Sequence, residues 1–433
     1  MPETVFDYAE RAWLGDLDDI LDGGSFGGEV HDVADGVGWY PAFGNSITFA
    51  TADDLILFDT GSPFGAADLF RAVRAWTPNP LTTAFYSHGH IDHVFGMGPF
   101  DDEAADLGRP RPIVIAHEAV TERFARYAIT RGYNGVINRR QFQSSTLEWP
   151  SVYRLPDVTY HETMTISRGG LTFRLFHVKG ETDDATIAYI PQRKVLCMGD
   201  MFLWVAPNCG NPQKVQRYPA EWARALRHAA GLGAEIMLPS HGAPVFGPDR
   251  IATALLETAE WLESLVEQTL KLLNEGARLD EIIHAVRPPA HLAERPYLQA
   301  RYDEPEFVVR NLWRQYGGWY DGNPANLKPA PDPIVARAIA ELAGGAQVLA
   351  DTALRAAADG DLRLAGHLAE MAALAAPADE AIHRARAEVF SARAKAERSL
   401  MAQGIFTWAA AESQSIINGQ PPETRSPFTS GTS

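Results

Sequence analysis

A short stretch near residue 90 concentrates the side chains that are best suited to binding metal ions. Residues 87–93 read Ser-His-Gly-His-Ile-Asp-His, so three imidazoles and a carboxylate fall within six residues: His88, His90, Asp92 and His93. They directly follow an apolar run at residues 84–86, which is typical of the end of a buried strand, and Gly89 allows the backbone to turn. Neutral imidazole and carboxylate together suit zinc, and also iron or manganese, so the pattern predicts a metal site.

The spacing within this motif favours two metal ions. His88 and His90 can reach one ion, while Asp92 and His93 face a neighbouring position about 3.5–4 Å away, as two-metal hydrolases require. Four ligands cannot satisfy two ions, so distant residues must supply the others. The alternative is that these are ordinary solvated histidines, since the chain contains 13 histidines. However, three histidines beside a carboxylate at the end of a strand favour the metal site.

Other polar groups also follow apolar runs that are typical of strands. They are Asp59-Thr60-Gly61 after residues 55–58, the segment 177–184 after residues 171–176, Gly199-Asp200 after residues 195–198, and Ser240-His241-Gly242 after residues 236–239. Histidine, glutamate and aspartate at the ends of separate strands, on one edge of a layered sheet, form the arrangement that a dinuclear site needs. Two divalent ions lower the pKa of a bridging water from about 15.7 towards about 7 and so generate a hydroxide nucleophile. Asp92 can be both a ligand and the base that orients it, and the predicted reaction is hydrolysis.

The elements that must position these groups alternate between strands and helices in the first half of the chain. Strands are expected at residues 38–40, 46–50, 55–58, 112–116, 171–176, 186–190, 195–198 and 236–239, and helices at residues 6–15, 66–76 and 118–127. Residues 131–150 have no clear periodicity and are expected to form a long loop beside the site. This alternation predicts a layered α/β domain over residues 1–248.

The second half of the chain has the composition of helices. Helical spacing is found at residues 251–273, 278–286, 304–316 and 334–409, and residues 350–394 read as a helix-turn-helix unit of tetratricopeptide type. An α-helical domain is therefore expected over residues 249–417, and the Pro-, Ser- and Thr-rich residues 418–433 are expected to be a disordered tail.

Composition sets limits on partners and compartment. The 433 residues carry a net charge of −17 that is spread along the chain, which disfavours nucleic acid and anionic membrane surfaces as partners. Cys197 and Cys209 are the only two cysteines and are expected to be free thiols in a reducing compartment. The sequence has no leader pattern and no run of about 18 apolar residues, so a cytoplasmic protein without membrane insertion is expected.

These motifs together resemble the metallo-β-lactamase superfamily. The loop at residues 179–182, Lys-Gly-Glu-Thr, has Glu181 where the superfamily usually has histidine, and His177 falls four residues too early to replace it. A glutamate there resembles the bacterial alkylsulfatase family, as do residues 189–198. Residues 316–327 look like that family's dimerisation signature, and residues 344–346 match as well. The resemblance implies an αββα sandwich followed by an all-α dimerisation domain, and a homodimer.

The resemblance also implies roles for individual residues. One zinc ion would be held by His88, His90 and Glu181, the other by Asp92, His93 and His241, with Asp200 bridging where the family has glutamate. Asn208 matches an asparagine that contacts sulfate in the family, Arg217 fits an arginine nearby, and both are candidates for catalysis and substrate binding. Further candidates for holding an anion are Tyr133, Arg139 and Arg140, with Tyr302, His284 and His291 as weaker ones. An arginine expected near residues 212–213 is replaced by Gln213, a histidine aligns with Phe307, and the family's sterol-carrier-like domain is absent.

The leading hypothesis is therefore a dinuclear zinc hydrolase that cleaves a sulfate ester or a related ester of a small molecule. The alternative is the same metal chemistry on a lactone, thioester or phosphodiester, with Phe307 marking a less anionic pocket. The diiron oxidoreductase branch of the superfamily also replaces a histidine in the third loop by a carboxylate, but it usually carries a flavin domain, which is not visible here. A non-enzymatic scaffold is the last possibility, and it leaves seven competent ligand positions unexplained.

Overall fold

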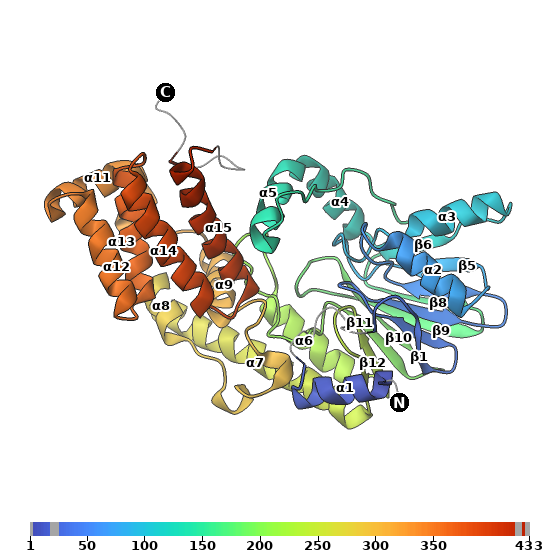
Figure 1. The fold of residues 1–433 in the computed structure, drawn as a ribbon. Coiled ribbons are helices and arrows are strands. Elements are labelled where there is room, and N and C mark those ends of the chain that lie inside the picture. The colour runs from blue at the N-terminus through green and yellow to red at the C-terminus, as the bar shows by residue number, and fades with distance from the viewer. Residues whose placement is uncertain (1–2, 18–25, 421–426, 429–433) are drawn as a thin grey trace. The chain divides into compact units, whose positions relative to one another are not determined.

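The computed structural model describes residues 3–17, 26–420 and 427–428. The chain divides into two compact units, here called the first unit (1–130 and 150–318) and the second unit (131–149 and 319–433). The first unit contains all the strands of the described chain, together with the helices that cover them (Figure 1). The second unit is built from helices alone.

Two sheets form the centre of the first unit. The 7-stranded sheet has the order β1 (His31–Ala34), β2 (Val37–Tyr40), β3 (Ser46–Ala50), β4 (Leu55–Phe58), β5 (Leu81–Phe85), β6 (Ile113–His117) and β7 (Val158–Tyr160). The 6-stranded sheet has the order β13 (Val245–Phe246), β12 (Ile236–Pro239), β11 (Val195–Gly199), β10 (Ala185–Ile190), β9 (Leu171–Val178) and β8 (Thr163–Arg168). The pairs β4–β5, β5–β6, β6–β7 and β11–β12 are parallel, and the other pairs are antiparallel.

Alternating side chains explain why the two sheets form a four-layered sandwich. In β4, Ile56 and Phe58 point into the core between the sheets, whereas Leu55 and Leu57 point to the outer face. That outer face is covered by α2 (Ala66–Trp76), α3 (Met97–Asp106) and α4 (Ala119–Ile129). The outer face of the second sheet is covered by α6 (Pro219–Ala230) and α7 (Pro248–Asn274) (Figure 1). The expected αββα fold, followed by a helical region, is confirmed.

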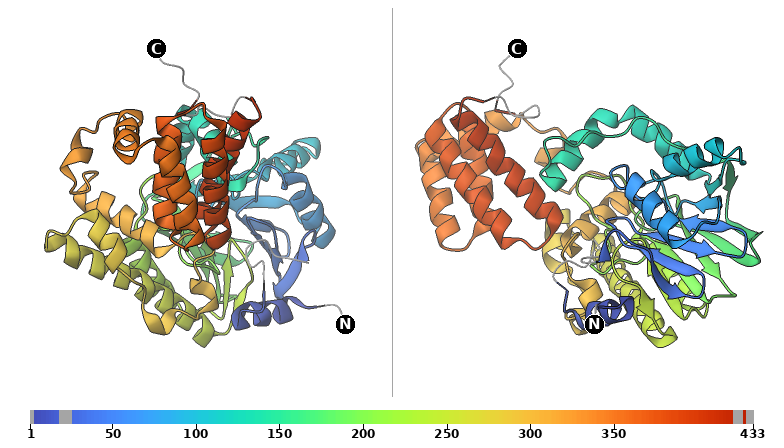
Figure 2. Two further views of the ribbon diagram at one scale, coloured as in Figure 1. Left: turned by 60° about the vertical axis from the view of Figure 1, so that its left-hand side comes forward. Right: turned by 45° about the vertical axis from the view of Figure 1, so that its right-hand side comes forward.

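The remaining helices of the first unit are α1 (Val5–Leu14), α8 (Leu279–Ala285) and α9 (Pro305–Gly317). The second unit consists of α5 (Arg131–Phe142), α10 (Pro324–Leu327), α11 (Asp332–Ala343), α12 (Ala346–Ala358), α13 (Leu362–Ala375), α14 (Glu380–Ala396) and α15 (Leu400–Ile417). Helices α12 to α15 pack one against the next in chain order, which Figure 2 shows from two sides. The helix-turn-helix pattern expected within residues 350–394 corresponds to α12, α13 and α14.

The expectation of a loop at residues 131–150 is wrong for its first part, because residues 131–142 form α5. Two glycines and a run of polar residues hide the helical period of this segment. Tertiary packing supplies the missing stabilisation: Ile137 is buried, and α5 packs against α15. Gly404 permits this contact, since a Cβ atom there would lie 2.6 Å from the carbonyl oxygen of Gln141.

The compact units do not follow the expected boundary between residues 248 and 249. Helix α7 buries Ile251, Leu255 and Leu262 in the core that it shares with α6 and the second sheet, so it belongs to the first unit. The expected tail at 418–433 lies mostly outside the described residues, but Phe428 is described, and it packs against His383 and Arg386. Among the described residues, no single helix is long and apolar enough to cross a membrane, although the bent pair α11 and α12 meets that test when joined.

Candidate metal centre

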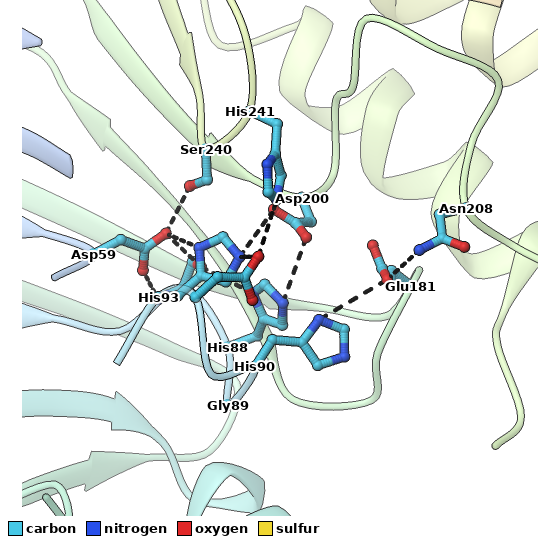
Figure 3. A network of polar contacts seen from close by, with 12 residues as sticks. Asp59, His88, Gly89, His90, His93, Glu181, Asp200, Asn208, Ser240 and His241 are labelled. Carbon is cyan, nitrogen blue, oxygen red and sulfur yellow. Dashed lines mark hydrogen bonds and ion pairs between the residues drawn. The ribbon is translucent and has the colours of Figure 1, made fainter. Parts of the chain in front are cut away.

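Five loops at one edge of the sandwich bring the expected metal ligands together. The loop after β5 carries His88, His90, Asp92 and His93, and the loops after β9, β11 and β12 carry Glu181, Asp200 and His241 (Figure 3). The loop after β4 contributes Asp59 behind them. These strands end at the same edge because β4 and β5 are parallel, and because β9 and β11 run in the same direction on either side of β10.

The first group of ligand atoms lies around His88, His90 and Glu181, here called the first ligand set. The Nδ1 atom of His90 is 3.9 Å from Oε1 of Glu181, and Nε2 of His88 is 3.6 Å from Oδ2 of Asp200. Potential ligand atoms of His90, Glu181 and Asp200 all lie within 4.8 Å of one another, which is close enough for them to share one ion.

The second ligand set consists of Asp92, His93 and His241. Oδ2 of Asp92 is 3.4 Å from Nε2 of His93 and 3.5 Å from Nε2 of His241. Oδ1 of Asp200 lies 3.5 Å from the same atom of His93 and 3.3 Å from that of His241. Asp200 therefore offers one oxygen to each set, as a bridging ligand would, and the assignment of ligands to two ions stays a prediction.

The donors fit a metal ion by chemistry as well as by position. Among the described residues, Nε2 of His88, Nε2 of His93 and Oδ1 of Asp200 are buried atoms with no hydrogen-bond partner. Buried polar atoms nearly always have a partner, so three such atoms from neighbouring ligands fit the coordination of a cation. Imidazole nitrogens and carboxylate oxygens are ligands that zinc, iron and manganese accept.

The electrostatics of the two ligand sets differ. Burial lowers the pKa of His88 to about 4 and holds the pKa of His90 well below its usual range, so both rings are neutral and retain a lone pair. Burial also opposes the charge of His93, but Asp92, Asp200 and Asp59 together raise the pKa of this ring well above its usual range. The second set thus lies in a strongly negative environment that favours a cation.

Asp59 anchors the second ligand set from behind. Its Oδ2 atom accepts hydrogen bonds from Ser87 Oγ at 2.7 Å, from Ser240 Oγ at 2.6 Å and from Nδ1 of His93 at 3.0 Å, and its Oδ1 accepts from the Ser87 amide at 2.7 Å. The bond to Nδ1 leaves Nε2 of His93 free to face a metal ion. Asp59 has a φ of 59°, a region that Asp and Asn enter more readily than other side chains with a Cβ atom.

Two further side chains, one of them cationic, contact the oxygen of Glu181 that also lies near His90. Nδ2 of Asn208 donates to Oε1 of Glu181 at 2.6 Å, and Nη1 of Arg217 lies 2.5 Å from the same oxygen. Burial raises the pKa of Glu181 to about 7, although Arg217 acts in the opposite direction. Nε of Arg217 is buried and has no hydrogen-bond partner among the described residues, so it can donate to a further anion.

Two more titratable side chains lie near Glu181: Lys214, which the sequence analysis did not identify, and Tyr302, which it gave only as a weak candidate. Burial lowers the pKa of Lys214 to about 7, and the charges of Glu181 and Asp92 act against this shift, which places the ammonium group near the metal ligands. Burial raises the pKa of Tyr302 above its usual range, and the same two carboxylates raise it further, so this phenol is protonated and also lies nearby. Lys214 directly follows Gln213, and that adjacency is the one signal in the sequence that could have pointed to it.

Other predicted site residues lie elsewhere. Tyr133, Arg139 and Arg140 are on α5 in the second unit, where Arg140 lies over the ring of Trp408, and their contact with a substrate stays a prediction. His284 and His291 are exposed and form ion pairs with Asp280 and Glu260 at the surface of the first unit. Neither histidine belongs to the metal-binding groups found among the described residues.

A separate group of possible ligands lies at the ends of β6 and β7. His117, Glu118 and His161 have ligand atoms within 4.8 Å of one another. Glu118 and His161 are exposed, and both ring nitrogens of His117 already have hydrogen-bond partners, in the carbonyl of His161 and the amide of Ala119. This group, here called the surface histidine group, is much less suited to a metal ion than the buried centre.

Comparison with known protein families gives two matches along the chain. Residues 39–241 match the metallo-beta-lactamase superfamily, and residues 278–415 match the alkyl sulfatase dimerisation family. The first match contains all seven expected ligands. The second contains α8 to α14 and most of α15.

Characterised relatives are alkylsulfatases. A linear primary-alkylsulfatase from Pseudomonas sp. is 28% identical over 338 residues, which cover 72% of this chain and 62% of that protein. An (R)-specific secondary-alkylsulfatase from Pseudomonas sp. is 29% identical over 75% of this chain and 53% of its own length, and an alkyl/aryl-sulfatase from Saccharomyces cerevisiae is 28% identical over 71% and 50%. The chain thus spans between 50% and 62% of the length of these relatives.

Solved structures share the fold. The stereoselective inverting sec-alkylsulfatase from Pseudomonas sp. superposes with a TM-score of 0.78 at 22% identity, over 91% of this chain and 66% of that one. A double mutant of the same enzyme superposes with a TM-score of 0.80 over 96% of this chain.

Proposed function

Because this chain belongs to the metallo-β-lactamase superfamily and carries an alkyl sulfatase dimerisation region, we propose that it is a dinuclear zinc-dependent hydrolase of a sulfate ester or a related ester. The observation that carries this proposal is the clustering of seven ligand side chains. Three of them, His88, His93 and Asp200, have buried ligand atoms without a hydrogen-bond partner among the described residues, and a fourth, Glu181, lies beside the Arg217 guanidinium group. The substrate would be a small molecule with an anionic head group.

The proposed chemistry divides between the metal ions and the protein. When bound, two zinc ions supply a water of lowered pKa and polarise an ester oxygen. Asp92 lies in the second ligand set, 3.4 Å from His93 and 3.5 Å from His241, and would orient that water and hold its proton. No serine or cysteine nucleophile is needed, and Cys197 and Cys209 are both buried with their pKa raised by burial, so neither is a ready thiolate.

Recognition of an anionic group would fall to the residues around Glu181. Arg217 can direct its orphan Nε–H group at a sulfate oxygen, Asn208 lies beside it, and the Lys214 ammonium group adds a further positive charge. Lys214 and Tyr302 would then take over the contacts that Gln213 and Phe307 cannot make. Preorganised donors of this kind stabilise negative charge as it develops in the transition state.

Assembly and compartment are part of the same proposal. A homodimer is supported by the match to the dimerisation family and by exposed apolar side chains on α11, including Ile334 and Leu342. A cytoplasmic location is supported by the two free cysteines, since thiols persist in reducing compartments.

The test is release of inorganic sulfate by the full chain loaded with Zn²⁺. The substrates are a primary and a secondary alkyl sulfate, an aryl sulfate, a lactone and a phosphodiester, with sulfate measured by ion chromatography. We expect sulfate release that falls at least about 100-fold in Asp92→Asn and persists in His161→Ala, a matched change at the surface histidine group. Turnover of the lactone or phosphodiester without any sulfate release would overturn the sulfatase proposal in favour of the alternative hydrolase.

A further inference from the structure

Arg123 is a buried cation that the chemistry proposed above does not use. It lies on α4 with only 3% of its side chain exposed. Its Nε donates to Oδ2 of Asp184 at 2.7 Å, and its Nη2 forms an ion pair with Asp183. Asp184 is completely buried, so Arg123 is the cation that balances its charge.

The same carboxylate also contacts the metal-binding motif. Oδ2 of Asp184 accepts a hydrogen bond from the backbone amide of Gly89 at 3.1 Å, and Gly89 lies between His88 and His90. The approach is close, because a Cβ atom on Gly89 would lie 2.8 Å from Cδ of Arg123 and 3.1 Å from Oδ2 of Asp184. The turn that aims both histidines is therefore built directly on the ion pair.

Asp183 and Asp184 belong to the loop that supplies Glu181, so Arg123 connects two loops that are far apart in the sequence. One loop carries His88 and His90, and the other carries Glu181. These are the three members of the first ligand set. The Arg123–Asp184 pair has no such contact with the second set, whose support is Asp59, which accepts from the ring of His93 and from Ser240 beside His241. Asp59 also accepts from Ser87, whose hydroxyl lies 2.9 Å from Nδ1 of His88, so it contributes to both sets.

We propose that the Arg123–Asp184 pair is a positioning element for one of the two metal ions, holding His88, His90 and Glu181 at the distance that this ion requires. The inference rests on the proposed dinuclear centre and extends it: the Arg123–Asp184 pair contacts the loops of the first ligand set alone, whereas Asp59 supports the second set and also reaches His88 through Ser87. Arg123 and Asp184 contact neither an ion nor the substrate. Burial opposes the charge of Asp184, but Arg123 holds its pKa down at about 2, so the pair stays ionised at neutral pH.

The test compares Asp184→Asn with Asp183→Asn. Asp184→Asn keeps the shape of the side chain but removes the charge that holds Arg123 and the turn at Gly89. Asp183→Asn is the matched control, because Asp183 pairs with the same arginine yet is half-exposed and has no bond to Gly89. Binding of the two ions is followed by competition with a chromophoric chelator, first with Zn²⁺ and then with Co²⁺, whose visible spectrum reports the geometry of each site.

We expect Asp184→Asn to raise the dissociation constant of one of the two ions by about 10- to 100-fold, which is the usual cost of removing a group that orients metal ligands. The dissociation constant of the other ion should change by no more than about twofold. Asp183→Asn should leave both within about threefold. In a His90→Ala background, which already lacks a ligand of the first set, Asp184→Asn should have no further effect on the ion that remains. In a His241→Ala background, Asp184→Asn should lower the affinity for the ion that remains.

If the affinities for both ions fall equally, or if neither affinity falls, the pair serves folding alone and the inference is overturned. If Asp184→Asn does not fold, Arg123→Lys takes its place, since lysine keeps the charge but can make only one of the two contacts. It should show the same selectivity with a smaller change. A wild-type chain that binds fewer than two ions would instead refute the dinuclear proposal itself.

Discussion

Replacing Asp59 with asparagine is the perturbation that tests the support of His93 in the second ligand set most directly. Asp59 accepts four hydrogen bonds and is completely buried. Three of the four donors share Oδ2, so asparagine is best placed with its oxygen there. Its amide NH₂ group then faces the backbone amide of Ser87, and two donors oppose each other. Asparagine tolerates the positive φ at this position, so the backbone itself is not strained.

The magnitude follows from these contacts. One hydrogen bond to a charged group is lost, which costs about 1.5–3 kcal/mol, and the remaining three lose their charge assistance. We expect the free energy of unfolding of the metal-free protein to fall by about 2–4 kcal/mol. Without the carboxylate on Nδ1, His93 is no longer held in the tautomer and orientation that present Nε2, so affinity for one ion should fall about 10- to 100-fold.

The assay combines urea unfolding of the metal-free protein with chelator competition for Zn²⁺. Ser240→Ala is the control, because it removes one donor to the same oxygen but keeps the carboxylate and its bond to His93. It should cost about 1 kcal/mol in stability and leave both metal affinities nearly unchanged. Wild-type affinity for both ions in Asp59→Asn would refute the reasoning that Asp59 orients His93.

Three further predictions concern other parts of the molecule. Lys214→Met should raise KM for an alkyl sulfate about tenfold through loss of a charged contact, whereas Lys194→Met, which breaks a surface pair with Glu235, should not; equal KM values would remove Lys214 from the site. Leu342→Glu, at a side chain that is 89% exposed on α11, should weaken the proposed dimer at least about tenfold in light scattering, and an unchanged dimer would exclude this face. Burial lowers the pKa of His383 in the folded protein, so below about pH 6.5 the unfolded chain binds a proton at this residue that the folded chain does not. The contribution of His383 to stability is therefore fully present above this pH and should be lost as the pH falls below it. Thermal unfolding between pH 7.5 and 5.5 should show a smaller decline in His383→Gln, and an identical decline would contradict this assignment.

The elements that the sequence predicted best are those with a short run of apolar or β-branched residues or with a clear helical period. The strands at residues 46–50, 55–58 and 236–239 and the helix at residues 66–76 have the predicted bounds. Helix α3 was missed because it begins Met-Gly-Pro, and α5 because its glycines and polar residues carry no period. Both are stabilised by tertiary contacts, which local propensity does not record.

The candidate site shows the same division between local and distant information. Histidine and aspartate at short spacing could be found in the motif itself, and their distant partners could be found because each follows a strand. The residues that hold these ligands in place could not be found in this way. The bond from Asp184 to Gly89 joins residues that are 95 positions apart, and Ser240 is 181 positions from Asp59. No spacing rule connects such pairs, since only the packing of the two sheets brings them together.

The most direct test of the account is the number of metal ions bound per chain. It is best made on His161→Ala, which removes the surface histidine group, by equilibrium dialysis against Zn²⁺ followed by elemental analysis. We predict two ions per chain, and one or none when Asp200, which faces both ligand sets, is replaced by alanine. A chain that binds no ion, or that binds two ions equally well without Asp200, would contradict the dinuclear centre.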